Sequence, residues 1–295
     1  MKYALFLGCT IPARLIQYEL SARAVLEKLE VELIDIKEFN CCGYPLENTD
    51  FKASILAASR NLAIAQKKNL DILVLCKCGF GMLKKAAHFM KESPSLNKEI
   101  NSILEKEGLK FKGDIQIKHL LSVLYHDIGL DSIKENVAAP FSELKIATHY
   151  GCHALRPSDI VKFDDPVNPT IFDKLVEATG AQSIPWNAKL ECCGAPVFGI
   201  NDDLSMDLTE KKLLSANESG AALMCTACPY CQIQFDTVQR MIKETRSTEN
   251  HLIAPILYPQ LLGLSLGIEA KALGLDMNGI DVGGVSKFLQ AADGF

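Results

Sequence analysis

The chain has 295 residues, of which 48% are hydrophobic and 23% are charged. This length corresponds to one large or two medium-sized domains, and the composition excludes an intrinsically disordered chain. The formal net charge is −5 and the sequence contains no basic tract, which argues against nucleic acid as a partner.

The sequence indicates a cytoplasmic protein. Residues 1–8 begin directly as a strand pattern and lack the features of a signal peptide. No run of about 18 apolar residues occurs, so we expect no membrane span. Disulfides are rare in the cytoplasm, where clustered cysteines more often indicate metal or redox chemistry. The 11 cysteines of this chain therefore become the main clue to its function.

The first half of the chain predicts alternating strands and helices. A buried strand is followed by a helix that Thr10 can cap, and further strands and helices follow in turn. The predicted order is strand 3–8, a helix from Thr10, strand 31–36, helix 51–67 and strand 72–75.

The second half repeats this order. Its predicted elements are strand 145–150, helix 170–179, strand 181–186, helix 203–218 and strand 221–224. Strands that alternate with helices predict an α/β fold with parallel sheets and right-handed crossovers.

The cysteines are also duplicated. The first set is Cys9, Cys41, Cys42, Cys76 and Cys78, and the second is Cys152, Cys192, Cys193, Cys225, Cys228 and Cys231. Each adjacent pair opens the sequence Cys-Cys-Gly-x-Pro, with the glycine at 43 or 194. Agreement in both spacing and neighbours indicates an internal repeat.

Parallel strands explain why these cysteines meet. The carboxyl ends of the strands lie on one sheet edge, so residues 30 to 40 apart converge there, and we expect each half to form a pocket of four or five thiolates. Glycine at 43 and 194 is expected to let the backbone approach the bound group. Thiolates select zinc, Cu(I) or iron–sulfur clusters, and an adjacent pair favours a cluster over a single tetrahedral zinc ion.

The doubled pattern resembles the cysteine-rich CCG-domain family and, within it, the B subunits of heterodisulfide reductases. The resemblance covers nearly the whole chain. It implies two tandem Rossmann-like CCG domains with parallel sheets and cysteines at the strand carboxyl ends. The first would span residues 1–142 and the second 143–295, with a C-terminal helical tail from about 251. It also implies two noncubane [4Fe-4S] clusters that face a shared cavity.

The resemblance assigns the cluster ligands residue by residue. The second motif is complete, with Cys152, Cys192, Cys193, Cys228 and Cys231. In the first motif Cys9, Cys41, Cys42 and Cys78 match, but Gly81 stands where the family has a cysteine. Either Cys76 supplies the fifth ligand or the first cluster has four ligands and an open iron. Cys225 is left over and fits a buried apolar filler.

The resemblance further implies an enzyme, an iron–sulfur disulfide oxidoreductase that reduces the coenzyme M–coenzyme B heterodisulfide in methanogenesis. Its partners would be the ferredoxin-like C subunit together with the flavin-bearing A subunit, in a larger electron-bifurcating complex with hydrogenase or formate dehydrogenase. His153 is the candidate proton donor. Lys77, Arg14 and Arg156 lie near the cysteine loops and suit the anionic groups of that substrate.

Two alternatives remain open from the sequence. The chain could be a CCG-type electron-transfer subunit of another oxidoreductase, of the lactate, glycolate or succinate type, or of another disulfide reductase. It could also be a zinc-bound scaffold without activity. His149 is interpreted as an ordinary strand residue, and Trp186 as core or as a shield of the metal site.

Overall fold

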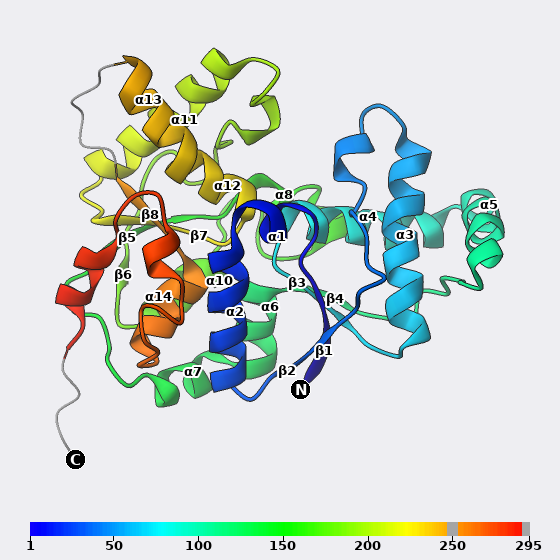
Figure 1. The fold of residues 1–295 in the computed structure, drawn as a ribbon, viewed down its shortest axis with the longest axis horizontal. Coiled ribbons are helices and arrows are strands. Elements are labelled where there is room, and N and C mark those ends of the chain that lie inside the picture. Colours follow the sequence, from blue (N-terminus) through cyan, green and yellow to red (C-terminus); the bar gives the residue numbers. More distant parts are fainter. Residues whose placement is uncertain (247–252, 291–295) are drawn as a thin grey trace.

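The structure is a computed structural model that describes residues 1–246 and 253–290. It contains two four-stranded sheets that lie side by side, one from each half of the chain (Figure 1). The strand orders are β2-β1-β3-β4 and β6-β5-β7-β8, and all neighbouring strands are parallel. The two sheets therefore have the same topology, as the sequence repeat predicts.

The first sheet is built on the buried strand β1. Its register places Ala4 of β1 opposite both Ile34 and Ile72. Helices on both faces bury the central strands, which is why those strands read as continuous apolar runs. The strands are β1 (Lys2–Phe6), β2 (Glu32–Asp35), β3 (Ile72–Val74) and β4 (Ile117–His119), and the main helices are α2 (Ile16–Lys28), α3 (Phe51–Lys67) and α4 (Lys77–Glu92).

The second sheet repeats this plan around β5 and β7. Its strands are β5 (Lys145–His149), β6 (Gln182–Ser183), β7 (Leu223–Thr226) and β8 (Ala254–Leu257). Its helices are α10 (Ile171–Glu177), α11 (Asp202–Glu218), α12 (Pro229–Ile233), α13 (Gln239–Arg246) and α14 (Tyr258–Ser265).

Shorter elements connect and extend these units. Two π-helical segments, Val123–Ile128 and Gln234–Val238, continue α6 and α12. The remaining α-helices are α1 (Thr10–Arg14), α5 (Pro94–Leu104), α6 (Leu120–Ser122), α7 (Leu130–Asn136), α8 (Cys152–Leu155) and α9 (Ser158–Val161). Short 3-10 turns cover Tyr44–Leu46, Glu105–Glu107, Ala195–Val197, Leu275–Met277 and Gly283–Phe288.

The two halves share one interior. Helix α2 of the first half packs against α14 of the second, and α4 packs against α8 and α9. The largest core cluster contains residues from both sheets, including Phe6 of β1 and Ile256 of β8. Within the described part of the chain, no helix is both long and apolar enough to cross a membrane.

The predicted α/β alternation is confirmed, and three details differ. Helix α1 is capped by Cys9, and Thr10 is its first residue. Each half has a fourth strand, β4 or β8, that the sequence did not predict. The expected helical tail from about 251 lies partly outside the described residues, and its described part begins with β8, which pairs with β7. The division at residues 142 and 143 remains a prediction.

The duplicated loops have duplicated supports. Asp50 caps α3 by accepting a hydrogen bond from the Ala53 N–H at 2.9 Å, and Asn201 caps α11 in the same way. Gly43 and Gly194 have φ of +84° and +93°. A Cβ at either position would lie 2.6 Å from a backbone oxygen of the following helix. These glycines are therefore required for the turn and its packing on the helix, a reason other than the expected approach to a bound group.

Candidate metal centre

The predicted cysteines gather where the strands of the two sheets end. We call Cys9, Cys41, Cys42, Cys76 and Cys78 the first cysteine group, and Cys152, Cys192, Cys193, Cys228 and Cys231 the second. Four of them stand at helix N-termini, where backbone N–H groups favour a thiolate. These are Cys9 before α1, Cys76 before α4, Cys152 at the start of α8 and Cys228 before α12.

The adjacent pairs behave alike in the two halves. Hydrogen bonding from Cys42 holds the pKa of Cys41 down at about 5. Hydrogen bonds from Cys152 and Cys193 hold the pKa of Cys192 at about 2, and the Gly194 N–H also donates to its Sγ at 3.4 Å. In each pair the first cysteine therefore ionises more readily than the second.

Cys228 joins the two groups. Its pKa is held well below the usual value because it accepts hydrogen bonds from Cys231, and then from Cys76 and Cys78 of the other half. Hydrogen bonding with Cys41 and burial raise the pKa of Cys42, and the proximity of Cys76 raises it further. Sulfur contacts therefore run from one half of the chain to the other, with Cys76 close to both groups.

A cavity of about 40 Å³ opens between the groups. Its walls carry sulfurs of both motifs together with two tyrosines, a histidine and a lysine. The lining residues are Tyr44, Lys77, Cys78, Gly151, Cys152, His153, Cys193, Ala195, Pro196, Cys228, Tyr230 and Cys231. A bound molecule in this space would touch both halves of the repeat at once.

His153 lies between the two motifs. Its Nδ1 is 3.6 Å from the Cys78 Sγ and 3.4 Å from the Cys152 Sγ. Its ring packs edge-on against Tyr44, with the ring centroids 4.8 Å apart. Burial lowers the pKa of His153, so the imidazole is neutral at neutral pH in this arrangement.

The same histidine explains the missing cysteine of the first motif. Gly81 occupies the position that corresponds to Cys231 in the repeat. A Cβ at Gly81 would lie 3.3 Å from the His153 backbone oxygen and 3.7 Å from its Cβ. A larger side chain there would press on α8, so Gly81 allows the two halves to approach each other.

Two buried lysines face the second cysteine group. Lys77 donates a hydrogen bond to the Tyr150 carbonyl, and its ammonium lies 5.1 Å from the centre of the Phe172 ring. Lys212 donates to the Ala188 carbonyl. Burial lowers the pKa of Lys212 to about 8, so it is still mostly charged at neutral pH. Both cations are within electrostatic reach of Cys231.

The repeat position of Lys212 in the first half is Asn61. This amide donates to the Asn40 and Cys41 carbonyls and accepts from the Asn40 N–H. Asn61 therefore holds the loop at the first cysteine pair, and Lys212 holds the segment before the second pair. The first half uses a neutral amide for this and the second half uses a cation. The surroundings of the two groups are electrostatically different.

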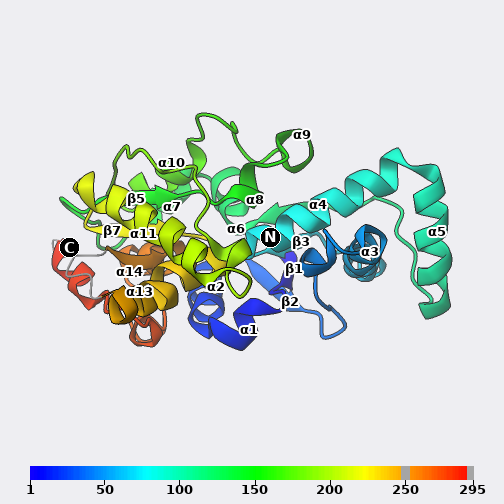
Figure 2. The ribbon, with the colours of Figure 1, turned by 90° about the horizontal axis from the view of Figure 1, so that it is seen from above.

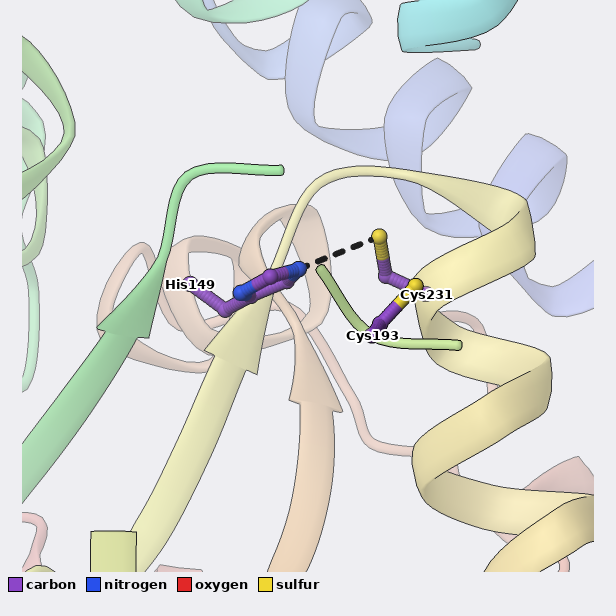
Figure 3. Close-up of side chains that lie close together, drawn as sticks. All are labelled: His149, Cys193 and Cys231. Atoms are coloured by element: carbon purple, nitrogen blue, oxygen red, sulfur yellow. Dashed lines mark hydrogen bonds between the residues drawn. The ribbon is translucent and has the colours of Figure 1, made fainter. Parts of the chain in front are cut away.

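His149 is a site residue that the sequence interpretation missed. It ends β5, and its Nε2 is 3.2 Å from the Cys231 Sγ (Figure 3). The ligand atoms of His149, Cys193 and Cys231 all lie within 4.8 Å of one another. Burial, and then the charge of Lys212, keep the pKa of His149 well below its usual value. Its place two residues before Gly151-Cys152, at a strand end, was the available signal.

The other residues singled out from the sequence are less central. Arg14 and Arg156 are exposed and do not line the cavity. Cys225 is fully buried inside β7, and burial raises the pKa of its thiol. The indole N–H of Trp186 donates to the Thr148 carbonyl at 3.0 Å. Trp186 also packs in the hydrophobic cluster that includes Cys193, and so covers the second cysteine group.

The donor set fits iron–sulfur chemistry. Ten thiols from several loops converge in two groups, which is more sulfur than one or two tetrahedral zinc ions require. The mixed set of His149, Cys193 and Cys231 alone also matches the ligand types of zinc.

Comparison with known proteins identifies the repeat. The cysteine-rich CCG domain model matches twice, over residues 3–84 and 146–236. The chain is 36% identical over 95% of its length to the B subunit of the ferredoxin:CoB-CoM heterodisulfide reductase of Methanosarcina mazei, covering 94% of that protein. It is 34% identical over 95% of its length to the 8-methylmenaquinol:fumarate reductase membrane anchor subunit of Wolinella succinogenes, covering 97% of it.

A solved structure supports the fold. A hypothetical protein from Helicobacter pylori superimposes with a TM-score of 0.76 at 17% identity, over 95% of this chain. The present chain spans about half, 52%, of that structure. Together with the duplicated motif and the sheet topology, these matches show that the chain belongs to the cysteine-rich CCG-domain family that includes the B subunits of heterodisulfide reductases.

Proposed function

We propose that this chain is the disulfide-reducing subunit of a heterodisulfide reductase, and that its substrate is the coenzyme M–coenzyme B heterodisulfide. The observation that carries the proposal is the cavity lined by sulfurs of both motifs, with His153 between Cys78 and Cys152. At about 40 Å³ the cavity has room for little more than the disulfide bond itself, whose two sulfurs would face one half of the repeat each while the rest of the substrate lies outside it. The name of the Methanosarcina mazei relative supports the same substrate.

The two cysteine groups would hold two noncubane [4Fe-4S] clusters. The second group would supply all five of its cysteines. In the first group the fifth ligand would be Cys76, because it precedes α4 two residues before Cys78 and its sulfur lies beside that thiol. When bound, such clusters would supply electrons one at a time together with iron that has affinity for sulfur.

The chain's own residues would manage protons and charge. Reduction of a disulfide to two thiols consumes two electrons and two protons. Neutral His153 with its proton on Nδ1 would give that proton to a product thiolate while its Nε2 takes up a proton from solvent. Lys77 is a buried cation in the cavity wall and would stabilise negative charge that forms there.

Electrons would arrive from partner proteins. The relatives are named as parts of ferredoxin-dependent reductases. By analogy we propose that the partners are the ferredoxin-like C subunit together with the flavin-bearing A subunit, in a cytoplasmic complex with hydrogenase or formate dehydrogenase. The sequence itself lacks the ferredoxin run of closely spaced cysteines, which supports the need for a separate electron donor.

Anaerobically purified protein tests the proposed activity. We expect it to contain iron and sulfide and to oxidise reduced viologen dye when the coenzyme M–coenzyme B heterodisulfide is added. The Cys193→Ala variant should lose turnover and the spectroscopic signal of one cluster. Its matched control is Cys225→Ala, which lies outside the cavity and should keep both. Iron-containing wild-type protein without heterodisulfide turnover would contradict the proposal.

A second candidate is an electron-transfer subunit of another oxidoreductase. The 34% identity to the Wolinella succinogenes fumarate reductase subunit favours it. Such a protein would exchange electrons with a flavoprotein partner and leave the heterodisulfide intact. Colourless protein with about one zinc per site would instead indicate the zinc-bound scaffold.

A further inference from the structure

A groove beside α4 concentrates positive charge on an acidic protein. It consists of two hollows of about 540 and 500 Å³ that share Lys84 and Ala87. Figure 2 shows α4 running from the centre of the molecule out to α5, with α9 alongside. Among the described residues that line the groove are five lysines and two histidines but no carboxylate: Lys84, His88, Lys91, Lys112, Lys118, His126 and Lys162. We call this the α4 groove.

Most of these lysines have no counter-ion. Lys118 forms an ion pair with Asp127 at 2.7 Å. Lys84, Lys91, Lys112 and Lys162 form none with the carboxylates of residues 1–246 and 253–290. The net charge of the chain is −5, so the positive charge of the groove is opposite in sign to that of the whole chain. A bound anion would relieve this local repulsion.

Positive charges lie close together at the centre of the groove. The Lys84 ammonium lies 5.6 Å from the centre of the Phe80 ring. Burial lowers the pKa of Lys84, and the charges of Lys162 and Lys118 lower it further. Three cations from α4, β4 and the segment after α9 therefore converge on one place.

The floor of the groove is apolar. Buried residues that line it are Phe80, Met90, Phe111, Ile117, Val161 and Phe163. A hollow with an apolar floor and a basic rim suits a protruding segment with acidic and apolar side chains better than a flat lipid surface.

The groove is connected to the first cysteine group through α4. This helix begins with Cys76 as its cap and Cys78 in its first turn. Lys84 is six residues after Cys78, about 9 Å along the helix axis. Phe80 lies between them and packs edge-on against His119, with the ring centroids 5.9 Å apart. A protein bound in the groove would sit close to the sulfurs of the first half.

We propose that the α4 groove is the docking site of an acidic electron-donor protein, which delivers electrons to the first cysteine group. This proposal rests on the proposed function only in assuming that the delivered electrons are used to reduce a disulfide. The docking itself is a statement about charge and shape, and binding measurements test it separately from turnover.

The probe is a small, strongly acidic two-iron ferredoxin, tested with the anaerobically prepared full chain. We expect binding that weakens steeply as salt is raised, because rim charges are screened. The Lys112→Glu/Lys162→Glu variant reverses one exposed lysine in each hollow and should bind at least about tenfold more weakly. The matched control, Lys28→Glu/Lys271→Glu, makes the same change in net charge away from the groove and should bind within about twofold of wild type.

Viologen separates this proposal from the proposed function. The dye is a small cation that needs no docking surface, so the groove variant should keep wild-type turnover with viologen and lose turnover with ferredoxin. Ferredoxin that fails to bind wild type, or that binds both variants equally, would overturn the docking site. Binding of phosphatidylglycerol vesicles or pyrophosphate to the groove in preference to ferredoxin would also overturn it. If the wild-type protein does not reduce the heterodisulfide with viologen as the electron donor, the proposed function is wrong, whatever the binding measurements show.

Discussion

At the scale of single residues, His153 has the most direct role in the proposed reaction. Its Nδ1 lies within 3.6 Å of sulfurs from both motifs. We expect His153→Gln to lower heterodisulfide turnover by about 100-fold, the usual loss when a proton donor is removed. Iron content should stay at the wild-type level, because glutamine is similar in reach and His153 is outside the proposed ligand set. Unchanged turnover, or loss of iron together with turnover, would contradict the assigned role.

Lys212 gives a second residue-scale prediction, on redox potential. A buried cation stabilises the reduced, more negative state of a nearby cluster. Replacing it with neutral methionine should lower the potential of the second cluster, on the order of 60 mV for about 1.4 kcal/mol of lost interaction. Potentiometric titration followed by electron paramagnetic resonance measures the shift. Lys212→Arg keeps the charge and is the control; a Lys212→Met potential equal to that of Lys212→Arg would refute the electrostatic effect.

At the scale of elements, the turn after each cysteine pair has strict backbone requirements. Gly43 has a positive φ, and a Cβ there would lie 2.6 Å from the Ser54 carbonyl oxygen. Gly43→Ala should therefore cost about 2 kcal/mol or more of unfolding free energy. Gly108 also has a positive φ but no atom within 4 Å of its Cβ position, so Gly108→Ala should cost about 1 kcal/mol. Urea unfolding of the two variants measures the difference, and equal losses would show that the contact with α3 is unimportant.

The junction of β4 and α6 should make stability depend on pH. His119 is fully buried, its Nε2–H donates to the Leu75 carbonyl and its Nδ1 accepts from the Leu121 N–H. Burial lowers the pKa of His119 to about 3. In the unfolded chain a histidine has a pKa of about 6.5. Between that pH and the folded-state pKa of about 3, the unfolded chain binds a proton that the folded chain does not. The stability contributed by neutral His119 is thus complete above about 6.5 and is lost as the pH falls toward 3.

Replacing His119 tests this dependence. Between pH 4 and 6, wild-type stability should fall with falling pH by up to about 1.4 kcal/mol per unit more than that of His119→Gln. Urea unfolding across this range gives the slopes. Parallel curves for wild type and His119→Gln would show that His119 does not titrate as a buried neutral group.

The elements also show how far a sequence predicts this fold. Helix 51–67 is observed with the predicted ends, since its apolar face and the Asp50 cap are both local signals. Strands β4 and β8 were missed although β3 and β6, which are equally short or shorter, were predicted. The repeated cysteine motif marks β3 and β6, whereas β4 and β8 follow the last cysteine of each motif and gain their stability from pairing with a distant strand.

At the scale of the whole molecule, the repeat predicts where the cysteines meet, because strand ends share one sheet edge. It does not predict what surrounds them. Lys212 lies in a charged stretch of α11 that reads as a solvated surface, and the fold buries it beside Trp186. His149 reads as strand interior and reaches Cys231 across the second sheet edge. The sequence places His149 at a strand end beside a cysteine, but the contacts of His149 and Lys212 join residues far apart in the chain, and local pattern does not identify those partners.

The packing of the two halves is a further property of the whole molecule. Gly81 lies against His153, and Cys228 interacts with cysteines of both halves. This packing supports our proposal that the two halves together form one site that holds two iron–sulfur clusters.

Anomalous X-ray diffraction at the iron absorption edge, from anaerobically grown crystals, tests this claim most directly. The account predicts two separate iron peaks on either side of the shared cavity. One should lie beside Cys41 and Cys42, and the other beside Cys192 and Cys193. Crystals without iron at either cysteine pair, or with iron at only one of them, would contradict it.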